Sequence, residues 1–357
     1  MNKMLPLVSV IVITKNNVKT IEKCIVNLKK QDYPKEFYEI IFVDGNSSDG
    51  TQEIIKKNLR LNGYPHVKFY TENVGTMGFA RNLGVKEAKG DILVFIDGDA
   101  YPPDNWLREI VRRFMDQPDL AIVGGMDILT PPNYALDSIS SWRRFNKSIG
   151  VKAVSKIRTV NFAIKRDVLI SCGGFDPKLS HFDEAELMAR LFFEKNIRNI
   201  LYDPELFVFH ERGKRSLTNR IKKIFHKSVI GLPVLFRPYM VKMAISNPLS
   251  TIGTSLFFVF AGLTFTILLF SMALGLIPII YILFFLAFGA IFVVIYTFNM
   301  KRHTGKFESK IVFILMLDCL VRFVGTLFGL IRLLSLNIYR EIKNFCKRLI
   351  RFYDGIV

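Results

Sequence analysis

The first hundred residues alternate between short apolar runs and amphipathic stretches. The apolar runs are rich in β-branched residues and have the length of buried strands; they cover residues 8–13, 39–43, 67–70 and 91–96. The stretches between them have helical spacing of apolar residues and cover residues 21–30, 51–59 and 80–88. Strands that alternate with helices at this interval indicate a parallel sheet with crossover helices. The pattern therefore predicts an α/β, Rossmann-like domain.

Polar residues follow three of these runs at the point where the predicted strand ends. Thr14 and Asn16 follow the first run, Asp44 follows the second, and Asp97 and Asp99 follow the fourth. In sheets of this kind ligands bind beyond the carboxyl ends of the strands. We therefore expect a ligand site at this edge of the sheet.

The segment Asp97-Gly98-Asp99 has the chemistry of a divalent-cation site. Carboxylates are preferred ligands of Mg²⁺ and Mn²⁺, although an Asp-Gly turn after a strand is also common without an ion. Arg81, ahead of the strand, offers a guanidinium suited to phosphate. The alternative interpretation is that Arg81 lies on the solvent-exposed face of a helix and binds no phosphate. A cation held by the two acids would neutralise a diphosphate.

Several segments of the chain occur in an order and spacing that identify a family. The series runs through residues 8–16, 41–51, 78–84 and 90–99, and it continues at 173–176, 181–191 and 202–210. With these motifs the chain resembles the family 2 glycosyltransferases, which have the GT-A fold. The resemblance covers about residues 7–225 and implies an enzyme that takes its sugar from a nucleotide-diphosphate sugar.

The resemblance implies nucleotide-binding roles for the residues at the strand ends. Asp44 matches the family's acidic residue that contacts the nucleotide base or ribose, and Thr14 and Asn16 line the same pocket. Arg81 matches a residue near the base and the diphosphate. Asp97 matches the first, nucleotide-facing carboxylate of the DxD motif.

The resemblance also implies a metal site and a sugar site. Asp99 matches the second DxD carboxylate, a ligand of Mg²⁺ or Mn²⁺, and Gly98 lies between the two acids in the nucleotide-sugar site. His210 occupies a position that in some members helps to bind the metal or the diphosphate; a capping or solvent-exposed histidine is the alternative. Asn161 lies in a region that lines the donor-sugar and acceptor side. The implied cofactor is a divalent metal.

An acidic pair precedes the predicted helix Ala185–Phe193. In the family such a pair contains the general base. By alignment Glu184 takes that position, and Asp183 is the alternative because the order of the two acids is inverted here. Acids also favour the amino end of a helix through its dipole, without any catalytic role. A base has to come within about 3 Å of the acceptor hydroxyl.

The carboxyl-terminal part of the chain is basic and apolar. Residues 211–357 carry 20 basic and 5 acidic side chains, whereas residues 1–210 carry 29 and 26. Between Lys242 and Lys301, 58 consecutive residues are uncharged. This length predicts two membrane spans, at about residues 252–272 and 277–298.

A third apolar stretch, residues 311–336, predicts either another span or an interfacial helix. It contains Asp318, Arg322 and Arg332, and charges inside a span are costly unless they pair. An interfacial helix would keep the basic tail that follows on the cytoplasmic side.

Basic residues flank the uncharged stretch on both sides. The positive-inside rule therefore places both flanks and the amino-terminal domain in the cytoplasm. Anionic lipid headgroups explain these residues better than nucleic acid does. The predicted protein is a multi-pass protein of the cell membrane with a cytoplasmic domain (1–225), basic interfacial helices (226–250), an α-helical transmembrane region (251–336) and a basic tail (337–357).

Together these features predict an inverting hexosyltransferase that acts on a hydroxyl of a lipid-linked or polysaccharide-precursor acceptor. Its expected partners are a nucleotide-diphosphate sugar, that acceptor and membrane lipids, with no nucleic acid. A polyprenyl (dolichol) phosphate sugar synthase is the alternative, but a phosphate acceptor needs no base, so the acidic pair argues against it. A non-catalytic lipid- or partner-binding membrane protein is less consistent with the DxD motif and Arg81.

Overall fold

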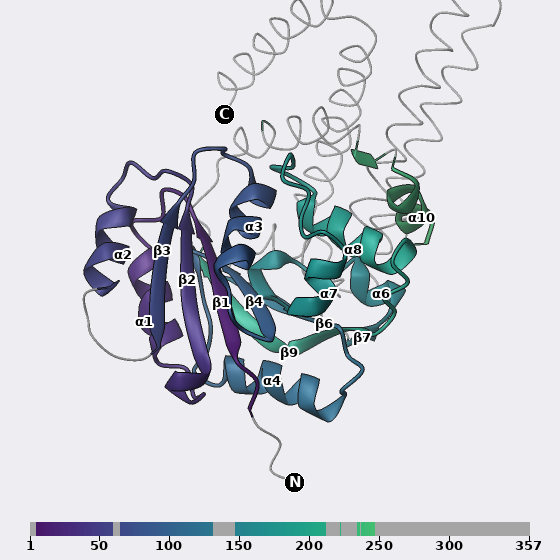
Figure 1. The fold of residues 1–357 in the computed structure, drawn as a ribbon, viewed down its shortest axis with the longest axis horizontal. Helices are drawn as coiled ribbons and strands as arrows, with labels where there is room; N and C mark the ends of the chain where they lie inside the picture. Colours follow the sequence, from purple (N-terminus) through teal and green to yellow (C-terminus); the bar gives the residue numbers. More distant parts are fainter. Residues whose placement is uncertain are drawn as a thin grey trace, which may run out of the picture. The chain divides into compact units, whose positions relative to one another are not determined.

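The computed structural model describes residues 5–59, 65–130, 147–211, 222, 234–235 and 237–246. The contacts divide the chain into two compact units, of which the first comprises residues 1–137 and 143–212. This unit contains all the strands and most of the helices that the structure describes (Figure 1).

The first unit has nine described strands. They are β1 (Val8–Thr14), β2 (Tyr38–Asp44), β3 (His66–Thr71), β4 (Ile92–Asp97), β5 (Ala100–Tyr101), β6 (Ile122–Thr130), β7 (Ser148–Ile149), β8 (Phe162–Lys165) and β9 (Ile200–Glu211). The described helices of this unit are α1 (Ile21–Lys29), α2 (Thr51–Leu59), α3 (Met77–Glu87), α4 (Trp106–Asp116), α6 (Val151–Val154), α7 (Arg166–Ser171) and α8 (Asp183–Phe193). Short 3₁₀ turns lie at Lys35–Phe37 and Thr159–Asn161.

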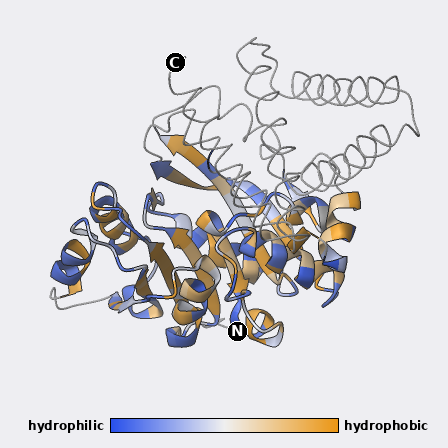
Figure 2. Ribbon diagram, turned by 90° about the horizontal axis from the view of Figure 1, so that it is seen from above, coloured by the Kyte–Doolittle hydropathy of each residue, from blue (hydrophilic) through white to orange (hydrophobic). Residues whose placement is uncertain are grey.

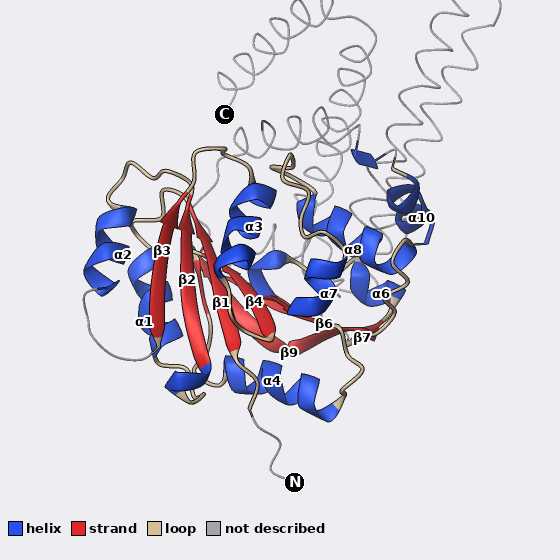
Figure 3. Cartoon of the chain, viewed as in Figure 1, coloured by secondary structure: helices blue, strands red, loops and turns tan. Residues whose placement is uncertain are grey.

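The strands form one mixed sheet in the order β3-β2-β1-β4-β8-β6-β9-β5, with β7 paired to β9 (Figure 3). The first four strands in this order are parallel, as the alternation of strands and helices predicts. The second half is not parallel throughout: β8 runs antiparallel to β4 and β6, and β5 and β7 run antiparallel to β9. The parallel prediction therefore holds only for the amino-terminal half of the sheet.

Helices cover both faces of the parallel half. Val8, Val10 and Val12 of β1 belong to an apolar cluster with the buried sides of α1 and α4. Ile11 points to the other face, where Gly84 of α3 lies so close that a Cβ atom there would be 2.4 Å from Ile11 Cγ2. Because both faces are covered, β1 and β2 are buried along their full length and read as continuous apolar runs in the sequence. Figure 2 shows the strands coloured mainly as hydrophobic.

The helices and strands predicted in the first hundred residues are confirmed to within three residues at each end. The later helix differs in a way that affects the acidic pair: it is predicted from Ala185, but α8 begins at Asp183. Asp183 and Glu184 therefore form its first turn instead of preceding it.

Of the second unit the structure describes one complete helix, α10 (Pro238–Ser246). It falls within the segment predicted to hold basic interfacial helices, and that assignment stays a prediction. The predicted spans at 252–272, 277–298 and 311–336 and the tail at 337–357 lie outside the described residues. Among the helices that the structure describes, none is long and apolar enough to cross a membrane.

Candidate active site

The parallel strands bring the predicted polar residues to one edge of the sheet. In the strand register Thr14 lies opposite Asp44, and Ile13 lies opposite Asp97. These residues end β1, β2 and β4 or immediately precede the end. Crossover connections place the carboxyl ends of parallel strands together, so the pairing of β1 with β2 and β4 assembles this part of the site.

Tight packing fixes the turn that joins Asp97 to Asp99. The Gly98 N–H donates to the carbonyl of Ile13 (2.9 Å), and the Gly98 carbonyl accepts from the Thr20 hydroxyl (3.2 Å). A Cβ atom on Gly98 would lie 2.6 Å from Thr14 Oγ1. Only glycine fits this approach of the turn to β1, which explains why the residue between the two acids is small.

A histidine from the far end of the domain completes a cluster around the two acids. The pairing of β5 with β9 sets His210 opposite Ala100, directly after Asp99. Ligand atoms of Asp97, Asp99 and His210 all lie within 4.8 Å of one another, and His210 Nε2 is 3.1 Å from Asp99 Oδ1. The structure thus brings together the residues predicted to hold the metal.

The donor set of this cluster fits a divalent cation such as Mg²⁺ or Mn²⁺. Two carboxylates and one imidazole supply oxygen and nitrogen ligands of the type these ions take. The side chains of Asp97 and Asp99 are 27% and 26% exposed, so the cluster is open to a ligand from solution. Burial raises the pKa of the Asp97 carboxyl; the charge of Arg81 opposes this rise, and that of Asp99 adds to it.

Arg81 connects the end of β4 to the acidic pair of α8. Its side chain is only 3% exposed, which excludes a solvent-exposed helix position. One terminal nitrogen donates to Asp183 Oδ2. The other donates to Thr159 Oγ1 (2.7 Å) and lies 3.7 Å from Asp97 Oδ1. Arg81 therefore holds a positive charge between the cation cluster and the first turn of α8.

The two acids of α8 are held in different ways. Asp183 is buried against Arg81; its burial raises its pKa, the charge of Arg81 opposes the rise, and that of Glu184 adds to it. Glu184 is half-buried and accepts from the Thr159 N–H (3.2 Å) and hydroxyl (2.9 Å). The residue before them, Phe182, has φ +63°, an uncommon conformation for an aromatic residue. This turn brings the acids to Arg81 and Thr159.

Thr159 is a site residue that the sequence does not reveal. Its hydroxyl accepts from Arg81 and donates to Glu184, so it links the guanidinium to the candidate base. It lies in a short 3₁₀ turn before β8 and belongs to none of the family motifs. A single threonine between Arg158 and Val160 carries no signal of this role in the sequence.

A further ion pair ties α8 to the glycine turn that precedes it. Arg190 binds the buried carboxylate of Glu186 one turn earlier, with an Nε–Oε1 distance of 2.9 Å. It also donates to the carbonyl oxygens of Cys172 and Gly174. Gly173 and Gly174 both have positive φ, at +84° and +74°, which favours glycine at each position. This network fixes the helix that carries the acidic pair.

The predicted nucleotide pocket is preorganised by bonds between two loops. Asp44 is fully buried and accepts from the Ser47 N–H (2.7 Å) and the Gln52 amide (3.0 Å). Asn16 donates through its N–H to Ser47 Oγ (2.8 Å) and has φ +53°. The Thr14 hydroxyl donates to Asn17 Oδ1 (2.9 Å). The loops after β1 and β2 therefore form one connected wall beside the cation cluster.

Asn161 has its polar atoms occupied inside the protein. It is 2% exposed, and its amide nitrogen donates to the carbonyls of Met126 and Leu206, both at 3.0 Å. Its oxygen accepts from the Trp106 indole (3.0 Å). These bonds join β6, β9 and α4, so the structure gives Asn161 a place in the framework beneath the site, whereas the family resemblance predicts contact with donor or acceptor.

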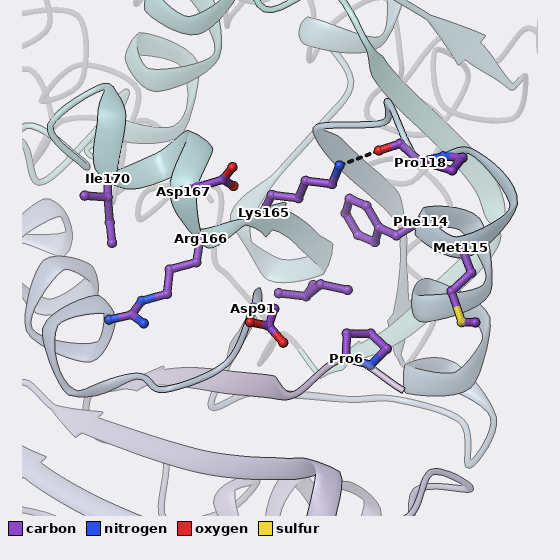
Figure 4. Close-up of a pocket in the computed structure, with 10 residues that line it drawn as sticks. Pro6, Asp91, Phe114, Met115, Pro118, Lys165, Arg166, Asp167 and Ile170 are labelled. Carbon is purple, nitrogen blue, oxygen red and sulfur yellow. Dashed lines mark hydrogen bonds between the residues drawn. The ribbon is translucent and has the colours of Figure 1, made fainter. Parts of the chain in front are cut away.

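One cavity lies at the opposite edge of the sheet. It has a volume of about 750 Å³ and lies where β4 begins and β8 ends (Figure 4). Its lining includes Asp91, Phe114, Lys165 and Arg166 and none of the residues predicted to form the site. The candidate site is therefore located by the grouping of charged residues at the carboxyl edge and not by this cavity.

Comparison with known proteins finds glycosyltransferases that are similar to this chain. Residues 9–172 match the family described as glycosyl transferase family 2, the family that the motifs of the sequence predict. Glycosyltransferase AglE of Haloferax volcanii is 32% identical over 177 residues, which are 49% of this chain and 58% of that protein.

A second relative is named for a lipid-linked acceptor. It is the Methanococcus voltae dolichyl N-acetyl-α-D-glucosaminyl phosphate 3-β-D-2,3-diacetamido-2,3-dideoxy-β-D-glucuronosyltransferase, 37% identical over 123 residues, which are 33% of this chain and 38% of that protein. The chain thus spans less than two thirds of the length of either relative.

A solved structure supports the fold. The mannosyltransferase PcManGT from Pyrobaculum calidifontis, in complex with GDP-Man and Mn²⁺, matches with a TM-score of 0.56 over 89% of this chain and 87% of that one. The sequences are 20% identical, so the similarity concerns the fold, a mixed α/β glycosyltransferase fold of the GT-A type.

Proposed function

We propose that this chain, which carries a glycosyl transferase family 2 domain, transfers a sugar from a nucleotide-diphosphate sugar to a hydroxyl of a lipid-linked or polysaccharide-precursor acceptor, with inversion at the anomeric carbon. One observation carries the proposal. Arg81 lies between the cation cluster at Asp97 and the acids of α8, so groups suited to a diphosphate and to a base share one site.

The donor would bind across the carboxyl edge of the sheet. The loop wall that includes the exposed Asn16, and that the buried Asp44 supports from inside through Ser47, would contact the nucleoside. Asp97, Asp99 and His210 would hold a divalent cation, which when bound neutralises the diphosphate. The PcManGT complex with GDP-Man and Mn²⁺ supports such a donor and ion in this fold. Arg81 would add its charge next to Asp97 and favour the departure of the anionic diphosphate.

Glu184 is the better placed general base. Asp183 is buried and its Oδ2 atom accepts from Arg81, so its carboxylate is not open to an acceptor hydroxyl. Glu184 is half-buried and oriented by Thr159. Glu184 would take the proton of the acceptor hydroxyl as that oxygen bonds to the anomeric carbon. The bond from this carbon to the diphosphate oxygen breaks, and its electron pair leaves with the diphosphate.

The acceptor class rests on the relatives and on the sequence. The Methanococcus voltae relative is named for a dolichyl-linked sugar, which is a lipid-borne hydroxyl acceptor. The apolar stretch between Lys242 and Lys301 would keep the enzyme at the membrane where such acceptors lie. We place the catalytic domain on the cytoplasmic face because the charged flanks of that stretch are basic.

The proposal is tested with the full chain in membranes. The membranes are incubated with radiolabelled UDP- and GDP-sugars, and extracted lipids are analysed by mass. The expected product is a lipid-linked glycan longer by one sugar, with an anomeric configuration opposite to that of the donor, as determined by NMR. Transfer to a bare polyprenyl phosphate would favour the synthase alternative. Absence of transfer from every donor, with Mn²⁺ present and the chain folded, would refute the assignment.

A further inference from the structure

A buried carboxylate lies behind the histidine of the cation cluster. Asp127 is on β6, in the apolar run Ile122–Thr130, and its side chain is 1% exposed. Its Oδ2 atom is 3.3 Å from His210 Nδ1. The other ring nitrogen, Nε2, faces Asp99 at 3.1 Å. The imidazole is thus held between an acid that belongs to the cluster and one that does not.

The strand pairing creates this contact. β6 and β9 run parallel, with Asp127 opposite Val208 and Leu129 opposite His210. Because side chains two residues apart share a face of a strand, Asp127 and His210 lie diagonally on one face. Arg158 Nη1 lies 4.0 Å from Asp127 Oδ2 and adds a positive charge on that side. The contact is therefore built into the sheet and does not depend on a loop.

We propose that Asp127 is a positioning residue that fixes the ring and the tautomer of His210, so that Nε2 presents its lone pair to the cation held with Asp97 and Asp99. The inference rests on the proposed function, which assigns a cation to this cluster. A carboxylate that accepts the Nδ1–H of a histidine leaves Nε2 as the ligand atom and restricts rotation of the ring. Asp127 itself contributes no ligand to the cluster.

The alternative is a structural role, in which Asp127 only compensates charge inside the sheet. Removal of a buried acid would then change stability without acting through His210. The two cases differ in one measurable respect. If Asp127 acts through the imidazole, its effect on cation affinity disappears when the imidazole is absent, whereas a structural effect remains.

The test measures Mn²⁺ affinity of the full chain by electron paramagnetic resonance of the free ion. The variants are Asp127→Asn, His210→Ala and the double variant, with thermal unfolding in the absence of metal as the check on folding. We expect Asp127→Asn to lower the affinity about 10- to 100-fold and to have no further effect on the His210→Ala background. Glu39→Gln, which neutralises a buried acid on β2 bonded to Ser9, is the matched control and should bind Mn²⁺ as the wild type does.

A second measurement needs no variant of Asp127. The ¹⁵N shifts of the His210 ring, assigned by their loss in His210→Ala, should show a protonated Nδ1 and a shift of Nε2 on addition of Mg²⁺. Coordination through Nδ1 would overturn the inference, as would unchanged Mn²⁺ affinity of folded Asp127→Asn or an equal loss with and without His210.

Failure of the inference and failure of the proposed function are distinguishable. If Asp127→Asn binds Mn²⁺ with wild-type affinity and sugar transfer is intact, only the proposed role of Asp127 is refuted. A wild-type chain that binds no Mn²⁺ overturns the inference and removes the cation from the proposed function. Transfer in the presence of a chelator would then show a metal-independent transferase.

Discussion

The guanidinium of Arg81 donates to the carboxylate of Asp183, 102 residues further along the chain, and both side chains are more than nine-tenths buried. The pair joins α3 to the first turn of α8 and lies beside Asp97 at the end of β4. One contact therefore contributes both to the packing of the domain and to the electrostatics of its site.

Arg81→Ala should destabilise the protein strongly. It leaves Asp183 buried without its cation, which typically costs about 3–5 kcal/mol. The free energy of unfolding is obtained from urea denaturation followed by tryptophan fluorescence. Arg108→Ala is the matched control, because Arg108 pairs with Asp32 at the surface and should cost less than about 1 kcal/mol. Equal losses of unfolding free energy in the two variants would show that the buried pair contributes no more to stability than the surface pair does.

Glu184→Gln should abolish the base while leaving the fold intact. We expect kcat to fall by about 10²- to 10⁴-fold, the usual contribution of a general base, with donor affinity unchanged. Asp183→Asn should instead lower the free energy of unfolding markedly and kcat only slightly, because the Asp183 carboxylate neutralises the charge of Arg81. Steady-state kinetics and unfolding curves of both variants separate the two roles. The reverse pattern would assign the base to Asp183.

Thr159→Val should reduce turnover by removing the hydroxyl that orients Glu184. A hydrogen bond to a charged group contributes about 1.5 kcal/mol or more, so kcat should fall about tenfold. Thr159→Ser keeps the hydroxyl and should restore most of the activity. If Thr159→Ser is as impaired as Thr159→Val, the methyl group and not the hydroxyl matters.

Gly98→Ala should disturb the turn between Asp97 and Asp99. The added Cβ would meet Thr14 Oγ1 at 2.6 Å and Thr14 Cβ at 2.7 Å, so the turn or β1 has to shift. We expect weaker Mn²⁺ binding and lower kcat, because the ligand atoms of Asp97 and Asp99 move. Gly75→Ala, where an added Cβ meets no atom within 4 Å but φ is +77°, tests backbone strain without a steric clash.

Glu39 should make stability depend on pH in the acidic range. Burial by itself would raise the pKa of Glu39, but Lys68, Ser9 and the Lys89 N–H together hold it below its ordinary value. A lowered folded-state pKa means that the charged form stabilises the protein. This stabilisation is complete above the unfolded-state pKa, about 4.3, and is lost as the pH falls through the folded-state value.

The comparison of wild type with Glu39→Gln measures this contribution. The difference in free energy of unfolding should be constant above about pH 5 and should shrink as the pH falls below about 4.3, until Glu39 of the folded wild type is also protonated and both chains carry a neutral side chain. If this difference in free energy of unfolding stays constant down to about pH 3, the destabilisation of Glu39→Gln comes from lost hydrogen-bond geometry and not from lost charge.

The parts of the site that lie on the parallel strands are predictable from the sequence. Continuous apolar runs mark β1, β2 and β4, and the polar residues that follow them must meet at one edge. Asp44, Asp97 and Asp99 therefore follow from local pattern and from the rule for ligands in such sheets. The family resemblance adds the acids of α8, which no local pattern distinguishes from acids that favour a helix terminus.

The parts that depend on long-range pairing are not predictable in this way. Asp127 is one acid in an apolar strand. Its position beside His210 follows only from the register in which β6 pairs with β9. Thr159 acquires a role because Arg81 and Glu184 approach it from two other elements. Asn161 shows the converse: its place near family motifs predicts a ligand contact, but three buried bonds occupy its side chain.

The two-residue strand β5 has a consequence for the order in which the protein becomes functional. It pairs with β9 and thereby sets His210 beside acids that lie more than a hundred residues earlier. Because the chain is synthesised from its amino terminus, the parallel strands leave the ribosome before β9 does. The ligand set is complete only after β9 has joined the sheet. The proposed cation cluster is thus completed by the last described strand to be synthesised.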